Sequence, residues 1–392
     1  MDDPSRCIFW EEDYQDIRHA VGRICDQFTG GYWQELDAAG AYPKAFVDAV
    51  TQAGWLSALI PEEYGGGGLP LRAAAVVLET IHKSGGSASA CHAQMYTMGT
   101  LLRHGSEAQK DEYLAAIASG KLRLQAFGIT EPASGSDTTN LRTRAERRDS
   151  EYIVNGQKVW TSRALHSDLM LLLARTTPRD RVIKPTDGLS VFLIDLRDLK
   201  DNGVEIRPID TMINHNTTEV FFNDARIPHK SLIGEEGKGF RYILDGLNAE
   251  RILIASESIG DARFFLHEAT NYAHDRKIFG GPIGRNQGIQ FPLARAHAET
   301  EAADLMARKA AALFDCGVPC GGEANMAKLL CAEAAWHAGE ACMQTFGGFA
   351  FSKEYDIERK WREARLYLTA PVSTNLLLAY IGQHILGLPK SY

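Results

Sequence analysis

The spacing of apolar residues changes twice along the chain. Over residues 11–124, apolar positions recur three and four apart, as in Leu71–His82 and Gln109–Ile117, and this period predicts helices. Over residues 126–232 the runs are shorter, and Leu169–Leu173 and Leu189–Ile194 read as strands. Helical spacing then returns in four long stretches, at 239–276, 286–314, 322–347 and 354–386, the last of them interrupted near Pro371.

Helices followed by strands and then by helices predict an α+β protein with three domains. We expect an N-terminal helical domain over residues 1–125, a middle β-barrel-like domain over 126–235 and a C-terminal four-helix bundle over 236–392. Within the middle domain, Asn155-Gly156 is a strong signal for a two-residue β-hairpin turn.

Composition and charge narrow the class of protein. A net charge of −8 and a pI near 5.9 argue against a nucleic-acid partner, which usually requires a basic face. No apolar run is long enough to span a membrane, and the opening residues lack the basic-then-apolar pattern of a signal peptide. The seven cysteines are scattered and make no zinc-binding pattern, so we expect reduced thiols, no metal and a cytoplasmic location.

Residues 127–162 carry the candidate chemistry. They hold small residues, hydroxyls and Trp160, but no pairing of a nucleophile with a base and no set of metal ligands. Glycine and serine let backbone N–H groups approach a flat polar ring, and the hydroxyls can hydrogen-bond its heteroatoms. Such a segment suits a protein that takes its reactive group from a cofactor.

Glycine-rich stretches elsewhere do not make phosphate loops. Gly65–Gly68 lacks a following Gly-Lys-Ser/Thr, so we interpret it as a turn, and Gly234–Gly239 lacks the spacing of a P-loop, so we expect it to start a helix. Two later segments are better candidates: Arg276–Gly280 followed by Gln287, and Gln344–Gly348. An arginine pairs well with pyrophosphate, and consecutive glycines permit close backbone approach; each segment alone is more often a helix end than a site.

Together and in this order, these segments resemble the acyl-CoA dehydrogenase family from Gly54 to Tyr392. The resemblance implies FAD bound without a covalent link, an acyl-CoA substrate, an electron-transfer flavoprotein as partner and a homo-oligomer, a dimer of dimers, in which a neighbouring subunit grips the ADP half of FAD. The cofactor-binding residues that it implies are Phe127, Ile129, Thr130, Ser136, Trp160, Thr161, Ser162, Arg276, Phe279, Gln287, Gln344, Gly347, Gly348, Ser373 and Asn375. For the substrate it implies Ser136, Asn248 and Arg251.

The catalytic base is where this chain departs from many members. Most carry Glu in a Tyr-Glu-Gly-Thr stretch, but here that position is Pro371, which accepts no proton and has no N–H. A second branch, that of the isovaleryl- and long-chain enzymes, places the base on the long helix after the β domain, where this chain has Glu250. We therefore expect Glu250 to be the base; the competing interpretation is a solvated carboxylate paired with Arg251, which the apolar run 252–255 weakens.

The resemblance implies oxidation of an acyl-CoA to a trans-2-enoyl-CoA, as in fatty acid or branched-chain acyl metabolism. Two alternatives stay open at this stage. One is a flavin oxidase or monooxygenase of the same fold, and the other is a non-catalytic FAD-containing partner protein, which Pro371 alone favours.

Overall fold

The computed structural model describes residues 14–199 and 202–390, so the predicted helical residues 11–13 lie outside the described residues. The chain divides into two compact units. The helical unit holds the described residues up to Ala39, Pro70–Ala88 and the chain from Asn248 onward, and the sheet unit holds Gly40–Leu69 and Ser89–Leu247. Each unit is therefore assembled from segments that are distant in sequence, and each is described separately.

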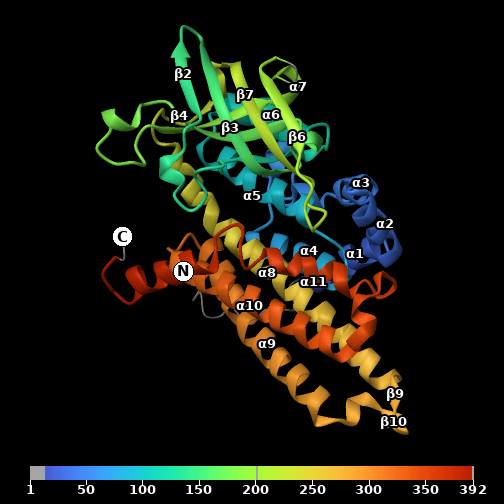
Figure 1. The fold of residues 1–392 in the computed structure, drawn as a ribbon. Coiled ribbons are helices and arrows are strands. Elements are labelled where there is room, and N and C mark those ends of the chain that lie inside the picture. The colour runs from blue at the N-terminus through green and yellow to red at the C-terminus, as the bar shows by residue number, and fades with distance from the viewer. Residues whose placement is uncertain (1–13, 200–201, 391–392) are drawn as a thin grey trace. The chain divides into compact units, whose positions relative to one another are not determined.

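The sheet unit contains an eight-stranded sheet in the order β6-β7-β3-β2-β4-β5-β8, with β1 paired in parallel to β4 (Figure 1). Its strands are β1 Leu124–Gly128, β2 Arg144–Arg148, β3 Glu151–Ser162, β4 Leu169–Arg175, β5 Leu189–Asp195, β6 Val204–Pro208, β7 Thr217–Pro228 and β8 Leu232–Ile233. Its helices are α3 Lys44–Gln52, α5 Ser89–His104, α6 Glu107–Ala118 and α7 Leu196–Leu199.

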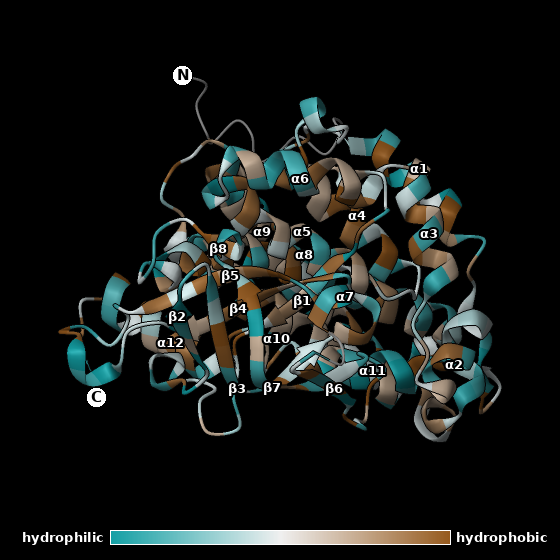
Figure 2. Cartoon of the chain, turned by 90° about the horizontal axis from the view of Figure 1, so that it is seen from above, coloured by the Kyte–Doolittle hydropathy of each residue, from teal (hydrophilic) through white to brown (hydrophobic). Residues whose placement is uncertain are grey.

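The strands β4 and β5 are buried on both faces, which explains their unbroken apolar runs. Met170 and Leu172 belong to one core, while Leu169, Leu171 and Leu173 belong to another that includes residues of α5 and α6. Figure 2 shows both strands as brown, hydrophobic bands. The predicted strands at 169–173 and 189–194 are thus confirmed.

The predicted hairpin turn at Asn155-Gly156 is wrong. β3 runs through both residues, and its register against β7 shifts between Val154 and Gly156, so the pair forms an irregularity within a strand. Gly156 is required there because a Cβ atom would lie 2.6 Å from Thr143 Cα. The β2–β3 turn lies instead at Asp149-Ser150, between the paired residues Arg148 and Glu151. Pairing on both edges of β3 outweighs the local turn preference.

The helical unit is formed by long helices (Figure 1). α8 starts in the sheet unit and continues here. The elements are α1 Gln15–Cys25, α2 Gly30–Ala39, α4 Leu71–Lys83, α8 Gly239–Asp275, α9 Gln287–Asp315, α10 Gly321–Phe346, α11 Ile357–Leu366 and α12 Thr374–Tyr380, with the short strands β9 Lys277–Ile278 and β10 Gly281–Pro282 between α8 and α9. The four predicted C-terminal stretches are confirmed, including the interruption around Pro371.

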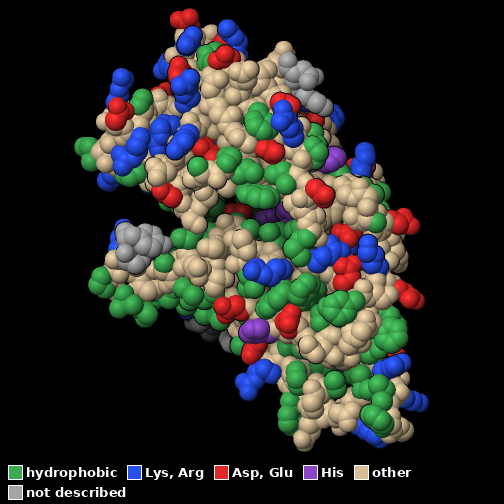
Figure 3. All heavy atoms as spheres, viewed as in Figure 1, with side chains coloured by type: hydrophobic (Ala, Val, Ile, Leu, Met, Phe, Trp, Pro, Cys, Tyr) green, Lys and Arg blue, Asp and Glu red, His purple; other side chains and the backbone are tan. Residues whose placement is uncertain are grey.

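The α+β fold class is confirmed: an N-terminal helical part, a middle β domain and a C-terminal helical domain. The exact domain boundaries stay predictions. The two glycine-rich stretches behave as expected, since Gly65 ends the short turn Glu62–Tyr64 and Gly239 begins α8. Charged side chains of both signs lie near one another on the face seen in Figure 3. Within the sheet unit, Lys230 and Glu112 form an ion pair at 2.8 Å.

Candidate functional site

Glu250 is buried on α8, with 6% of its surface exposed. Three of the four apolar residues that follow it, Ile252, Leu253 and Ala255, are fully buried, so this part of α8 is an interior helix. Burial raises the pKa of Glu250 to about 7, although the positive charges of Arg251 and Lys328 act in the opposite direction. The interpretation of Glu250 as a solvated surface carboxylate is therefore wrong.

Arg251, the next residue on α8, forms no ion pair with Glu250 among the described residues and hydrogen-bonds Asn248 instead. Its Nη1 donates to the side-chain oxygen of Asn248 at 3.0 Å, and its buried Nε has no hydrogen-bond partner among the described residues. Desolvation lowers the pKa of Arg251. The structure thus brings Asn248, Glu250 and Arg251 together on one turn of α8, with donor capacity on Arg251 left for a further group.

A second cation, which the sequence analysis missed, lies close enough to Glu250 to affect it. Lys328 on α10 is fully buried, and its ammonium donates to the backbone oxygens of Tyr367 and Val372, the latter at 2.7 Å. Desolvation lowers the pKa of Lys328 to about 8, opposed by the charge of Glu250. A lysine within the otherwise apolar stretch 326–332 was the available signal.

The same face of α8 carries a buried polar network further along. Tyr367 donates from its hydroxyl to Glu257 at 3.3 Å, and His82 Nδ1 lies 2.8 Å from Asp261. Lys360 pairs with Asp261 at 2.6 Å. Glu257 and Asp261 follow Glu250 by seven and eleven positions, a helical spacing that could have indicated a shared face. These buried polar groups pair with one another, as buried charges must, and the pairs link α4, α8 and α11.

The predicted flavin segment is assembled in the sheet unit by β1, the residues after it and β3. Lys158 is buried on β3 and donates to the backbone oxygen of Ile129 at 2.9 Å, and Val159 N–H donates to Thr130 at 2.9 Å. These bonds hold Ile129 and Thr130 beside the end of β3. Phe127 lies on β1 itself, and Ser136 lies in an exposed loop.

The end of β3 has the properties that a flat polar ring requires. Trp160 adopts a left-handed backbone conformation, with φ of 59°, and is 59% exposed. The adjacent Thr161 is buried, and its hydroxyl has no hydrogen-bond partner among the described residues. A buried hydroxyl without a partner costs free energy, so it marks a place for a ligand atom. The residues of this segment therefore fit a flavin.

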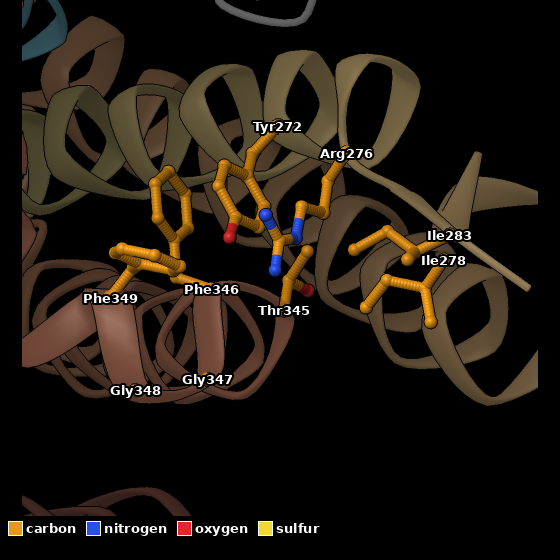
Figure 4. Close-up of a pocket in the computed structure, with 9 residues that line it drawn as sticks. All are labelled: Tyr272, Arg276, Ile278, Ile283, Thr345, Phe346, Gly347, Gly348 and Phe349. Carbon is orange, nitrogen blue, oxygen red and sulfur yellow. The ribbon is translucent and has the colours of Figure 1, made fainter.

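The late motifs meet in a pocket of about 460 Å³ in the helical unit, between the end of α8 and the end of α10 (Figure 4). Arg276 lies over the ring of Phe349, 5.4 Å from its centroid. Gly347 has φ of 58°, and a Cβ atom added to Gly347 or Gly348 would meet no atom within 4 Å. Open space before these glycines, next to a guanidinium, fits a phosphate-containing ligand.

Not every predicted residue joins this pocket. Phe279, at 95% exposed, and the exposed Gln287 and Gln344 lie outside its lining. Near the C-terminus, Ser373 caps α12 by accepting from Leu376 N–H at 3.4 Å, and Asn375 is exposed. No cluster of three metal-ligating side chains occurs within residues 14–199 and 202–390, and no helix in these ranges is long and apolar enough to cross a membrane.

Comparisons with known proteins match almost the whole chain. Models of the N-terminal, middle and C-terminal domains of acyl-CoA dehydrogenase match residues 11–121, 126–225 and 237–386. Acyl-CoA dehydrogenase FadE12 of Mycobacterium tuberculosis is 33% identical over 384 residues, covering 97% of this chain and 98% of that protein. The 3-(aryl)acrylate reductase of Clostridium sporogenes is 33% identical over 364 residues, covering 92% and 94%. The solved glutaryl-coenzyme A dehydrogenase in complex with glutaryl-CoA is 30% identical, with a TM-score of 0.89 and 97% coverage of both chains.

Proposed function

Since this chain belongs to the acyl-CoA dehydrogenase family, an oxidoreductase family, we propose that it oxidises an acyl-CoA thioester to the trans-2-enoyl-CoA with Glu250 as the base. The observation that carries this proposal is the buried carboxyl of Glu250, whose pKa burial raises to about 7. A base with a pKa near the working pH is both ionised often enough and basic enough to take a weakly acidic proton.

Family members are FAD-dependent, and FAD, when bound, supplies the acceptor for the hydride that leaves the β-carbon. Glu250 takes the α-proton at its carboxylate and becomes neutral, a form that its buried position favours. Arg251 and Lys328 balance the charge of the ionised base before that step. Thr161 and the residues of 127–130 would hold the flavin ring, and Arg276, Gly347 and Gly348 would hold the phosphates.

Glu250→Gln tests the base because it keeps the size of the side chain but accepts no proton. We expect acyl-CoA still to bind and perturb the flavin spectrum, while anaerobic bleaching slows by about 100-fold or more. Glu268→Gln is the matched control: Glu268 lies further along α8, and burial also raises its pKa. Near-normal bleaching in Glu250→Gln would refute the assignment.

The electron acceptor is proposed to be an electron-transfer flavoprotein, and the assembly a homo-oligomer. Reduced protein should reoxidise slowly with oxygen and quickly with an artificial acceptor. Rapid reoxidation by oxygen would favour the oxidase alternative instead, and absence of bleaching by every acyl-CoA in a chain-length panel would favour a non-catalytic partner.

A second candidate is reduction of an unsaturated acyl substrate, the reverse direction of the same proton and hydride transfers. The similarity to a 3-(aryl)acrylate reductase favours it. In that direction Glu250 would deliver its proton to the α-carbon. Supplying chemically reduced protein with enoyl and arylacryloyl substrates, and comparing the rates with oxidation of the saturated compounds, separates the two.

A further inference from the structure

Lys328 is an unusual residue to find in the interior of a helix bundle. It lies on α10 with no exposed surface, next to the buried residues Ala327, Leu329 and Cys331. Burying an ammonium group costs free energy unless it is hydrogen-bonded and its charge is balanced. Its two hydrogen-bond acceptors, the backbone oxygens of Tyr367 and Val372, are neutral, and within the described ranges no carboxylate lies within ion-pair distance of it.

Those two carbonyls belong to the segment between α11 and α12, which contains Pro371. Thr374 N–H and the Thr374 hydroxyl both donate to the backbone oxygen of Leu368, at 3.3 Å and 3.1 Å. These two bonds join the ends of the segment to each other. Lys328, on α10, adds a further constraint, because its one ammonium group binds the backbone oxygens of Tyr367 and Val372, which are five residues apart. A neutral donor with a single N–H or O–H could not hold both.

The segment that Lys328 holds packs on the same face of α8 as the base. Tyr367 forms an apolar cluster with Ile254 and Ala332, and its hydroxyl donates to Glu257, two turns after Glu250. The charged groups that act on Glu250 are Arg251, Lys328 and Glu257, of which the first two are cations. Lys328 is thus the one of these cations that comes from a different helix.

We propose that Lys328 is a positioning residue for Glu250: its ammonium fixes the Tyr367–Val372 segment against α8, and its charge favours the ionised form of the base. The proposal rests on the assignment of Glu250 as the base. It explains why a lysine occupies this place, since a neutral side chain of similar length would fill the space without supplying charge to a buried carboxylate.

The pH profile of kcat/KM distinguishes this role from a merely structural one. The base acts when ionised, so activity falls as the pH drops through the pKa of Glu250. Lys328→Met removes the cation and raises that pKa, so we expect the acid limb to move to higher pH by about one unit, with roughly fivefold greater loss of activity at pH 7 than at pH 9. Lys328→Arg, which keeps the charge, should leave the limb near its wild-type position.

Lys309→Met is the control for the loss of a lysine from the same unit, because Lys309 is 44% exposed in its side chain and pairs with Glu323 at 3.3 Å. We expect no movement of the limb. If Lys328→Met does not fold, Lys328→Gln takes its place, because its amide keeps a donor for one carbonyl. We expect its acid limb to move to higher pH by the same amount, about one unit. Equal loss of activity at all pH values in both neutral variants, or an unmoved limb, would overturn the proposal.

Failure of the proposal and failure of the base assignment give different results. If Glu250→Gln is active, the base assignment is wrong whatever Lys328 does. If Glu250→Gln is inactive and the limb stays in place in the neutral Lys328 variants, the base stands and the role of Lys328 is refuted. Infrared detection of the protonated Glu250 carboxyl, as the difference between wild type and Glu250→Gln, gives the same titration without turnover.

Discussion

The guanidinium of Arg251 donates to the side-chain oxygen of Asn248 at 3.0 Å, within one turn of α8. Arg251 is the sequence neighbour of Glu250, yet the two side chains form no ion pair among the described residues. The charge of Arg251 still acts to lower the pKa of the carboxyl. The carboxylate of Glu250 is therefore buried near the cations Arg251 and Lys328 but forms no ion pair with either among the described residues, so its oxygens can accept a proton.

The first prediction concerns stability and pH. Burial raises the pKa of Glu250 from its ordinary 4.5 to about 7, so between these values the native state binds a proton that the unfolded state has released. This group therefore makes stability fall as the pH rises from about 4.5 to about 7. At pH 8 Glu250→Gln should be the more stable protein, by up to about 3 kcal/mol. Chemical unfolding of both proteins at pH 5 and pH 8 measures it, and a gain that is larger at pH 5 would contradict the sign.

The second prediction is that the purified protein is yellow and that its FAD is not covalently bound. The buried Thr161 hydroxyl without a partner and the open space at Gly347 and Gly348 are the structural reasons. Acid precipitation should release the flavin into the supernatant, where its absorbance identifies it. Colour that stays with the pellet, or a colourless protein that gains no flavin absorbance when incubated with FAD, would contradict the prediction.

The third prediction links the cofactor to assembly. Arg276→Ala should weaken FAD retention and subunit association together, because a cofactor gripped across an interface stabilises the assembled state by mass action. Lys277→Ala is the matched control, since Lys277 is the exposed neighbour and outside the pocket. Gel filtration on dilution and flavin content are measured on the same samples. If Arg276→Ala changes one of these properties without the other, the link between them does not exist.

The fourth prediction compares Gly347→Ala with Gly348→Ala in order to distinguish two reasons for a glycine in the pocket: a strained backbone conformation and the need for open space. Gly347 has φ of 58° and ψ of −131°, a conformation that other residues rarely adopt, so Gly347→Ala should cost about 1–3 kcal/mol. Gly348 lacks a positive φ and is equally open, so Gly348→Ala should fold as well as wild type. Thermal unfolding of the apoproteins tests the strain, and FAD affinity tests the space. Equal destabilisation of both variants would rule out the strain.

The local pattern of the chain was sufficient for most of the fold. Helical spacing predicted α4, α6 and the long helices α8–α10, and apolar runs predicted β4 and β5, because each of these elements repeats one local conformation with a regular buried face. The flavin segment and Glu250 could also be identified from the sequence, because they were found by the order and spacing of residues along the chain. Their roles stay predictions.

The tertiary structure decided the properties that depend on residues distant in sequence, namely strand pairing and the pKa of buried groups. Asn155-Gly156 has the local preference of a turn, but pairing of β3 with both β2 and β7 makes it part of a strand. The pKa of Glu250 depends on burial and on Lys328, 78 positions away in the sequence. The sequence alone determined which groups are present and which helix or strand carries them. Only folding determined which of them lose water and which charges act on them, because desolvation and Coulomb interactions depend on distance in space.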